Sequence, residues 1–342
     1  MNAFALGDLD GDGILDIATA SDQQHGVGMV SVVRGRRDGT LAARRDFDAD
    51  SGHAISLGDL NGDGKLDVVT AETGVYVLLN HGDGTFPGGY DGRNRIETAI
   101  GAVSLALGDL NSDGKLDVVT ANNTGLFFSD RPSSISVLLG KGDGTFAPHV
   151  EYATGMFSDA IALGDLNGDG KLDVVVANYG RDSGTQSVSV LLGQGDGTFA
   201  AKVDYPSQYL PISLVLGDLN GDGTLDIILG AETTHGGVPD GSYVGVLLGK
   251  GDGTFADSVS YSIQDGAASL ALGDVNRDGK PDLVVSGGTV RLLLGKGDGT
   301  FADTIYYPAA SSTLALADLN ADGKLEVIAH SYPEIFVLNL CH

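Results

Sequence analysis

Apolar and polar residues alternate along most of the chain with the two-residue period of β-strands. The segments "AISLGDL" (54–60) and "VSVLLG" (188–193) alternate apolar residues with small or polar ones, whereas "LDVVVA" (172–177) contains a short continuous apolar run. Alternation is typical of a strand with one buried face, and a short apolar run is typical of a strand buried on both faces. No segment has a convincing helical period. The pattern therefore predicts an all-β protein.

The strands recur in seven repeats, each marked by an acidic phrase such as "GDLNGDGKLD" (58–67). A second phrase, "GDGTF", follows in the same phase in five repeats (82–86, 142–146, 195–199, 251–255 and 297–301), and a weaker version, "RDGTL", covers 37–41. Each repeat is interpreted as a strand A that ends at the acidic phrase, a strand B such as 66–71, a strand C such as 188–193, a GDGT turn and a strand D such as 199–205.

Four antiparallel strands in about 50 residues correspond to one blade of a β-propeller. Seven repeats predict a seven-bladed β-propeller formed as a single domain by residues 1–342, with blades that start near 2, 53, 102, 158, 211, 267 and 312. The last repeat stops after its strand C, "IFVLNL" (335–340). Either the last blade has three strands, or the chain is a fragment of something longer. The alternative, an open β array, is disfavoured because unclosed blades would expose apolar end faces.

The acidic phrase has the spacing of a calcium-binding loop. Counted as nine positions, it reads D-x-(D/N)-x-D-G-x-x-(D/E), and Ca2+ prefers six to eight oxygen ligands. Gly at position 6 gives the backbone the freedom that a sharp turn around an ion needs. The predicted side-chain ligands are Asp8, Asp10, Asp12, Asp16, Asp59, Asn61, Asp63, Asp67, Asp109, Asn111, Asp113, Asp117, Asp165, Asn167, Asp169, Asp173, Asp218, Asn220, Asp222, Asp226, Asp274, Asn276, Asp278, Asp282, Asp318, Asn320, Asp322 and Glu326. The predicted backbone carbonyl ligands at position 7 are those of Ile14, Lys65, Lys115, Lys171, Thr224, Lys280 and Lys324.

The alternative interpretation of this phrase is a set of ordinary Asp-Gly and Asn-Gly hairpin turns. Seven complete copies favour up to seven Ca2+ sites instead, and Mg2+ fits less well because it demands a stricter octahedron. Arg277 at position 4 and Pro281 at position 8 of the sixth loop, and Glu326 in the seventh, predict that these two sites are the weakest. Clustered carboxylates repel one another without a metal, so we expect calcium binding and folding to be coupled.

Composition and charge exclude two classes of partner. The net charge is -26, and four carboxylates in the first loop with three in each of the other six account for 22 of the 46 acidic residues. With only 20 Lys and Arg spread through the chain, we expect no nucleic-acid binding. No run of about 18 apolar residues occurs, so we expect no membrane insertion, and residues 1–7 carry no targeting signal. The single cysteine, Cys341, excludes a disulfide framework.

The GDGTF phrase predicts a hairpin turn followed by a core residue rather than a binding site. We expect its Phe residues, Phe86, Phe146, Phe199, Phe255 and Phe301, to pack between blades. The recurring Tyr residues of strand D, such as Tyr152, Tyr205, Tyr261 and Tyr307, are expected in the core as well.

The segments "SLALGDLNSDGKLDVVTAN" (104–122) and "AIALGDLNGDGKLDVVVAN" (160–178) resemble the FG-GAP or VCBS-type repeats of the integrin α-chain propeller superfamily. The resemblance covers essentially the whole chain and implies the propeller fold and calcium binding. The chain lacks a true Phe-Gly before strand A and a Gly-Ala-Pro after strand B, which favours a bacterial repeat protein over an integrin in the narrow sense. The superfamily includes adhesion receptors, lectins and polysaccharide lyases, so the resemblance alone does not select a function.

By similarity to such propellers, the calcium loops and the GDGT turns share one face, and the B-to-C and D-to-A connections form the other. These connections vary in length and content: 21–28, 88–98, 122–134, 178–186 and 231–243. Variable loops on a rigid scaffold are where recognition usually occurs, which predicts an extracellular recognition or adhesion module for a glycan or protein. The candidate ligand-binding residues are His25, Tyr90, Arg93, Arg95, Phe127, Phe128, Arg131, Tyr179, Arg181, His235 and Tyr243.

Two other functions stay open at this stage. A polysaccharide lyase or hydrolase would act at the propeller centre, but the seven His residues follow no repeat phase and no repeat stands out as catalytic. A calcium-rigidified spacer of a larger surface protein is also compatible with the near-identical repeats.

Overall fold

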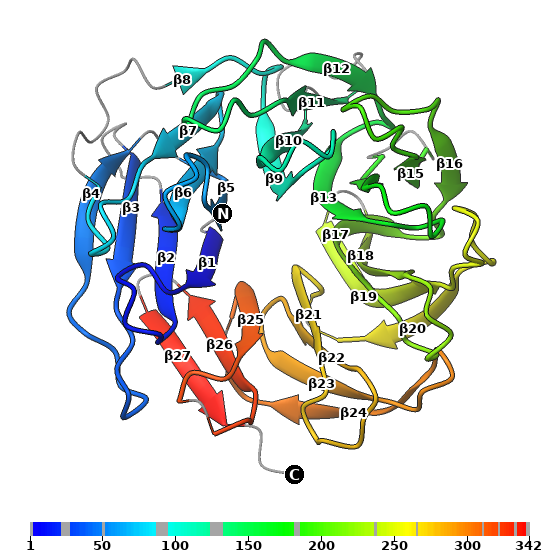
Figure 1. Cartoon of the computed structure of the whole chain (residues 1–342). Coiled ribbons are helices and arrows are strands. Elements are labelled where there is room, and N and C mark those ends of the chain that lie inside the picture. Colours follow the sequence, from blue (N-terminus) through cyan, green and yellow to red (C-terminus); the bar gives the residue numbers. More distant parts are fainter. Residues whose placement is uncertain are drawn as a thin grey trace. The chain divides into compact units, whose positions relative to one another are not determined.

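Seven antiparallel β-sheets make up the fold in a computed structural model that describes residues 3–21, 28–49, 52–86, 95–123, 133–180, 185–235, 238–264, 266–309, 311–320, 322–331 and 334–339. Six sheets have four strands and the last has three, and in each sheet the strands lie in chain order (Figure 1). Within these residues every regular element is a strand, and no helix is long and apolar enough to span a membrane. The predicted seven-bladed β-propeller with a three-stranded last blade is confirmed.

The chain divides into two compact units, residues 1–161 with 193–198, and residues 162–192 with 199–342. The first sheet comprises β1 (Ala3–Gly7), β2 (Asp16–Ser21), β3 (Gly28–Val33) and β4 (Arg45–Ala49). The second comprises β5 (Ala54–Gly58), β6 (Asp67–Ala71), β7 (Val75–Leu78) and β8 (Arg95–Ile96). The third comprises β9 (Ala102–Gly108), β10 (Asp117–Asn122), β11 (Ser134–Leu138) and β12 (Val150–Ala153).

The remaining four sheets follow the same order along the chain. The fourth comprises β13 (Ser158–Gly164), β14 (Asp173–Asn178), β15 (Ser187–Leu191) and β16 (Val203–Pro206). The fifth comprises β17 (Leu210–Gly217), β18 (Asp226–His235), β19 (Val238–Leu247) and β20 (Val259–Ile263). The sixth comprises β21 (Ser269–Gly273), β22 (Asp282–Ser286), β23 (Val290–Gly295) and β24 (Phe301–Tyr307), and the seventh β25 (Thr313–Ala317), β26 (Glu326–Ser331) and β27 (Glu334–Asn339).

The second strand of each sheet forms the centre of the core. Strands β6, β10 and β14 are buried at every residue, as expected for apolar runs with neighbours on both faces. The five Phe residues of the GDGTF phrases are between 4% and 7% exposed, which confirms that they are core residues. Tyr205 meets Phe255 edge to face at 5.4 Å between ring centroids, and Tyr261 meets Phe301 in the same way at 5.6 Å. Each of these pairs joins the fourth strand of one sheet to the next sheet in the chain.

The first strand of most sheets ends in a glycine because a leucine of the next sheet occupies the adjoining space. A Cβ atom on Gly58 would lie 2.6 Å from a methyl carbon of Leu116 and 2.9 Å from one of Leu107. Gly7, Gly164, Gly217 and Gly273 meet leucines in the same manner. The glycine that directly precedes position 1 of the acidic loop is therefore a packing residue. The sequence pattern did not indicate this role.

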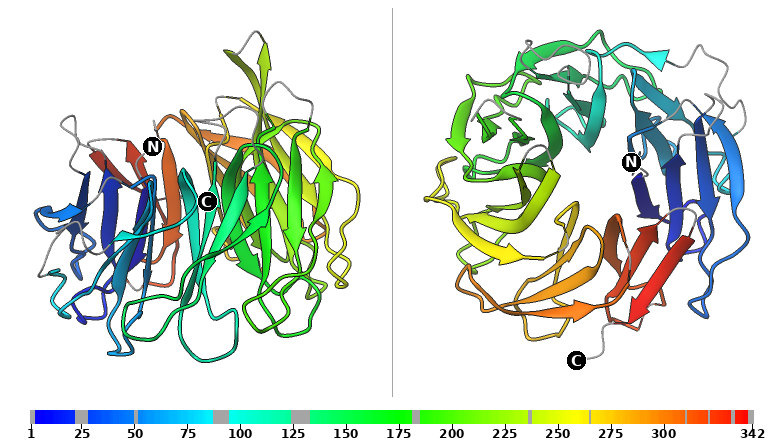
Figure 2. Two further views of the ribbon diagram at one scale, coloured as in Figure 1. Left: turned by 90° about the horizontal axis from the view of Figure 1, so that it is seen from above. Right: turned by 180° about the vertical axis from the view of Figure 1, so that it is seen from behind.

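The connection expected at 231–243 is corrected by the structure. These residues belong to the two longest strands, β18 and β19, which pair from Ile227 with Leu247 out to His235 with Val238. The paired ends extend beyond the neighbouring strands of their sheet (Figure 2). Thr233 and Thr234 are β-branched and favour an extended backbone, so this segment forms a hairpin arm in place of an irregular loop.

Candidate metal-binding loops and ligand pocket

The carboxylate at position 1 of each acidic loop holds the loop backbone in place. In the second loop, the N–H groups of Gly62 and Asp63 donate to Asp59 Oδ1 at 2.8 and 3.1 Å, and the N–H of Gly64 donates to Asp59 Oδ2 at 2.8 Å. The bond from the position 6 N–H to the position 1 carboxylate recurs in all seven loops. The seven loops therefore fold alike.

Two positions of the loop have a left-handed backbone. At position 6 the glycines have φ between 77° and 85°, which confirms the need for glycine there. Position 4 is also left-handed, with φ of 75° at Gly62, 60° at Ser112 and 62° at Arg277. Position 4 is glycine in four of the seven loops. This regularity signals the left-handed backbone there, and the sequence analysis missed it.

The carboxylate at position 9 is buried and joins three strands. Asp67 is fully buried, and it accepts the N–H of Leu60 at 3.0 Å through Oδ2 and the N–H of Asn80 at 2.8 Å through Oδ1. Asp16, Asp117, Asp226 and Asp282 each make the equivalent pair of bonds, one within the loop and one at or just after the end of the third strand.

Burial raises the pKa of the Asp67 carboxyl, and the nearby Asp63 and Asp59 carboxylates raise it further, against the lowering effect of the two N–H groups. In the last loop, Glu326 Oε2 accepts the N–H of Leu319 at 2.9 Å, while Oε1 accepts the side-chain amide of Asn320 at 3.3 Å. The longer side chain of Glu326 therefore keeps the bond within the loop, which corresponds to the bond from the Leu60 N–H to Asp67.

The first loop gathers three of its predicted ligands closely. One oxygen from each of Asp8, Asp10 and Asp16 lies within 4.8 Å of the others, a spread that one ion with metal–oxygen distances of about 2.3–2.6 Å spans. The donor set fits a hard divalent cation, because all three groups are carboxylates. Asp12, at position 5, accepts the N–H of Ile14 at 2.9 Å.

The side chains at positions 3 and 5 carry further contacts in the other loops. Asn61 Oδ1 accepts the N–H of Asp63 at 2.9 Å, and Asp63 Oδ1 accepts the N–H of Lys65 at 3.1 Å. The Lys65 ammonium lies 3.2 Å from Asp63 Oδ2 on the surface, and Lys115 and Lys171 make the same exposed ion pair in their own loops. A lysine at position 7 thus lies beside the carboxylate at position 5.

The GDGT turns of the second to sixth sheets are each bonded to the acidic loop of the preceding sheet. The N–H of Gly144 donates to the carbonyl of Leu60 at 3.0 Å, and Gly253 donates to Leu166 at 3.2 Å. Gly84, Gly197 and Gly299 donate in the same way to Leu9, Leu110 and Leu219. The turn predicted as a local hairpin therefore also links neighbouring sheets.

Two arginines connect acidic loops to their neighbours. Arg34 lies 3.1 Å from the Asp10 carboxylate and also donates to the carbonyl of Asp83 in the next sheet. Arg277, which was expected to act as a cation near its own site, donates to the carbonyl of Asp322 in the seventh loop at 3.3 Å. Both cations thus bridge two successive repeats.

Most of the candidate ligand-binding residues fall outside the described part of the chain. Arg95 lies exposed on β8 and donates to the carbonyl of Thr73 at 2.6 Å. His235 is placed only as the last residue of β18. His25, Tyr90, Arg93, Phe127, Phe128, Arg131 and Arg181 lie outside the described residues.

Tyr179 and Tyr243 lie at or beside a pocket of about 790 Å³ at the end of the fifth and sixth sheets opposite their acidic loops. Tyr243 stacks on Tyr209 with ring centroids 3.6 Å apart and an interplanar angle of 9°. Tyr179 donates its hydroxyl to Glu232 at 3.1 Å, and Glu232 lines the pocket. The two tyrosines that sequence reasoning selected are therefore brought to one pocket.

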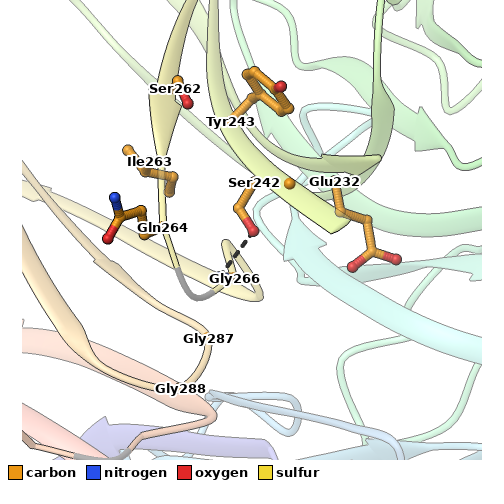
Figure 3. Close-up of a pocket in the computed structure, with 10 residues that line it drawn as sticks. Glu232, Ser242, Tyr243, Ser262, Ile263, Gln264, Gly266, Gly287 and Gly288 are labelled. Atoms are coloured by element: carbon orange, nitrogen blue, oxygen red, sulfur yellow. Dashed lines mark hydrogen bonds between the residues drawn. The ribbon is translucent and has the colours of Figure 1, made fainter. Parts of the chain in front are cut away.

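The pocket is lined largely by small residues, with polar and apolar surface in similar proportion (Figure 3). Ser242 accepts the N–H of Gly266 at 2.8 Å, which joins β19 to the segment before β21. Gln264 was not selected from the sequence, nor were Glu232 and Tyr209, because no repeat phase marks them. The described lining residues are Glu232, Gly241, Ser242, Tyr243, Ser262, Ile263, Gln264, Gly266, Gly287 and Gly288.

Comparison with known proteins matches the FG-GAP-like repeat to residues 8–70, 59–120, 126–176, 165–229 and 236–285. No curated protein is significantly similar to the chain in sequence. Among solved structures, BBS1N in complex with ARL6DN, soaked with lead, aligns with a TM-score of 0.61 at 14% identity, covering 95% of this chain and 88% of that chain. The mercury-soaked form of that complex gives the same values. At this identity the likeness concerns the fold alone.

Proposed function

The chain belongs to the FG-GAP-like repeat family, and we propose that it is a calcium-binding recognition module that holds a protein or glycan ligand at the ends of its sheets opposite the acidic loops. The observation that carries the proposal is the division of each sheet into two unlike ends. One end repeats the same nine-residue loop with the same internal bonds, and the other end differs from repeat to repeat.

The acidic loops have the composition that Ca2+ requires. Bound Ca2+ would neutralise the grouped carboxylates, and the residues that would hold it are those at positions 1, 3, 5 and 9 with the carbonyl at position 7. The carboxylates of Asp8, Asp10 and Asp16 support this, because three negative charges lie within 4.8 Å of one another. An extracellular location is part of the same proposal, since extracellular Ca2+ modules work with dissociation constants of about 10⁻⁴–10⁻³ M.

Calcium titration of the chelator-treated protein by calorimetry tests this part of the proposal. We expect saturable binding with a stoichiometry of up to seven and a Tm that rises with calcium concentration. Asp63→Ala should reduce the stoichiometry by one, whereas Asp257→Ala, an exposed carboxylate outside the loops, should leave it unchanged. Absence of heat, together with an unchanged Tm in millimolar Ca2+, would overturn calcium binding.

The pocket around Glu232 and Tyr243 supports the recognition part. The Tyr243 ring is held by stacking on Tyr209, and the Glu232 carboxylate is held by the Tyr179 hydroxyl. Both groups are therefore preorganised for a ligand. Because the described lining residues include one carboxylate and no cation, the pocket favours a neutral or cationic group over a uronate or sulfate. BBS1N, which shares the fold, is seen in complex with another protein, and this supports a protein as the ligand.

Protein and glycan arrays probed with the labelled chain test the recognition part. We expect a ligand whose binding is lost in Tyr243→Ala and retained in Asp257→Ala, which changes an exposed residue outside the pocket lining. A ligand that binds both variants equally would place recognition elsewhere on the molecule.

A further inference from the structure

The side chain at position 7 of the acidic loop lies between that loop and the GDGT turn of the same sheet. In the second loop this residue is Lys65, and its ammonium lies 3.2 Å from Asp63 Oδ2. The same ion pair has a distance of 3.2 Å in the third loop, 3.3 Å in the fourth and 3.9 Å in the sixth. In these four loops a cation of the chain itself is therefore paired with the position 5 carboxylate.

The stem of this lysine is ordered by packing on the GDGT turn. A Cβ atom on Gly82 would lie 2.6 Å from Lys65 Cδ, and one on Gly142 would lie 2.9 Å from Lys115 Cδ. Exposed ion pairs usually contribute little, because holding two long side chains in one geometry costs entropy. Here the lysine stem fills the space beside a glycine, so that its ammonium is directed back to its own loop.

The fifth loop differs from the second at position 7 alone. The second and fourth loops read "DLNGDGKLD" (59–67 and 165–173), and the fifth reads "DLNGDGTLD" (218–226). Thr224 donates its hydroxyl to Asp222 at position 5, and a Cβ atom on Gly251 would lie 2.9 Å from its methyl carbon. Three carboxylates without a lysine give the fifth loop a charge of -3, whereas three carboxylates and one lysine give the second loop -2.

This difference in charge bears directly on a divalent cation. Calcium-binding loops set their affinity by the number of ligand charges and by the rigidity of the site. A carboxylate that attracts an ammonium attracts a second cation less strongly, and the two cations repel each other. The bonds from the loop N–H groups to the position 1 carboxylate are the same in the second and fifth loops, so the two backbones fold alike.

We propose that the residue at position 7 sets the calcium affinity of each acidic loop. A lysine there is a tethered cation that opposes calcium, so the second, third and fourth loops bind calcium more weakly than the fifth. The fifth loop is then filled before these three as the calcium concentration rises. This role rests on the proposed function, because position 7 can tune calcium affinity only in loops that bind calcium.

Hydrogen exchange resolved by peptide tests the proposal, because it reports each loop separately in the full chain. Calcium is added to the chelator-treated protein, and the midpoint of protection is read for residues 59–67, 109–117, 165–173 and 218–226. We expect protection of 218–226 at a calcium concentration about three- to tenfold lower than that of the other three loops. Lys65→Met, which removes the ammonium and keeps a stem of similar length, should lower the midpoint of 59–67 by a similar factor and leave that of 109–117 unchanged.

Three further variants separate charge from packing. Thr224→Lys is the reciprocal change and should raise the midpoint of the fifth loop to that of the second. Lys65→Arg keeps the charge and should leave the midpoint of the second loop in place. Lys202→Met is the matched control, because it removes an ammonium from an ion pair with Asp204 outside the acidic loops, and it should move no midpoint.

The outcomes distinguish position 7 from calcium binding itself. Equal midpoints for the second and fifth loops, unchanged in Lys65→Met and Thr224→Lys, would exclude the role of position 7 and leave calcium binding intact. An equal shift in Lys65→Met and Lys202→Met would also exclude it, since the effect would then be one of total charge. Absence of protection in every loop at millimolar calcium would overturn calcium binding, and the role of position 7 with it. If Lys65→Met fails to fold, the second and fifth loops of the unaltered chain still give the comparison.

Discussion

Leu60 is bonded in two directions: its N–H donates to Asp67 at 3.0 Å within its own loop, and its carbonyl accepts the N–H of Gly144 from the next sheet at 3.0 Å. The residue at position 2 of the acidic loop therefore belongs to two sheets at once. Five successive sheet pairs repeat this relationship. The geometry of each of these five acidic loops is consequently coupled to the position of the neighbouring turn.

The carboxylate at position 9 should stabilise the fold even without metal. Asp67→Ala leaves the buried N–H groups of Leu60 and Asn80 without their acceptor, at a cost of about 1–3 kcal/mol for each. We expect a lower urea midpoint in excess EGTA, and a smaller loss for Asp63→Ala under the same conditions. If Asp67→Ala were destabilising only in the presence of calcium, position 9 would act solely as a metal ligand.

The left-handed backbone at position 4 predicts an opposite pair of stability changes. Ser112→Gly removes the steric cost of φ 60°, offset in part by the greater freedom of glycine in the unfolded chain, and should stabilise the protein by about 0.5–1 kcal/mol. Gly62→Ser at the equivalent position, with φ 75°, should destabilise it by a similar amount. Denaturant titration of both variants checks the sign, and a loss of stability in Ser112→Gly would contradict the explanation.

The glycine at the end of β5 should not tolerate a methyl group. In Gly58→Ala the new Cβ meets Leu116 and Leu107 at less than 3 Å, and overpacking of this kind costs about 1–3 kcal/mol. Thermal unfolding should show a lower Tm. The seventh sheet has Ala317 at this place, so Ala317→Gly serves as the reciprocal control and should change the Tm much less. Equal effects of the two changes would exclude leucine packing as the cause.

His330 predicts a pH dependence of stability. The side chain is 4% exposed on β26, and burial lowers its pKa below the ordinary 6.5. Its stabilising contribution is therefore complete above pH 6.5 and is lost as the pH falls toward the lowered pKa, with a slope of at most about 1.4 kcal/mol per pH unit. Compared at pH 7.5 and 5.5, the unaltered chain should lose more stability than His330→Gln, which does not titrate. Equal losses of stability in the unaltered chain and in His330→Gln would show that His330 does not contribute to the pH dependence.

The repeats made most of the architecture predictable from sequence. Seven copies of one phrase fixed the number of sheets, and the apolar run after each phrase identified the buried second strand. The glycine at position 6 was predictable too, since a tight turn needs it. Within the described part of the chain, Tyr179 and Tyr243 lie beside and in one pocket, and their role in ligand binding stays a prediction.

Contacts between repeats were the part that the sequence could not supply. The clash at Gly58, the bond from Gly144 to Leu60 and the link from Arg277 to Asp322 all join segments about 45 to 85 residues apart. A periodic pattern shows which residues face a core, but it does not show which partner they meet there. Segment 231–243 differs in length and content from its counterparts in the other repeats, which favours a connection, whereas the structure has the β18–β19 arm there.

The short range of the bonds inside each acidic loop has a consequence for how the chain reaches its fold. Strands β10 and β14 differ at one residue, "DVVTAN" against "DVVVAN", so either one is a chemically acceptable partner for the wrong β9 or β13. The bonds that close a loop join residues two to seven positions apart, and contacts at that distance form within about 10–100 ns. We therefore expect the first two strands of each repeat to pair with each other before a strand of a distant repeat comes into contact. In this way the acidic loop would reduce mispairing between near-identical repeats.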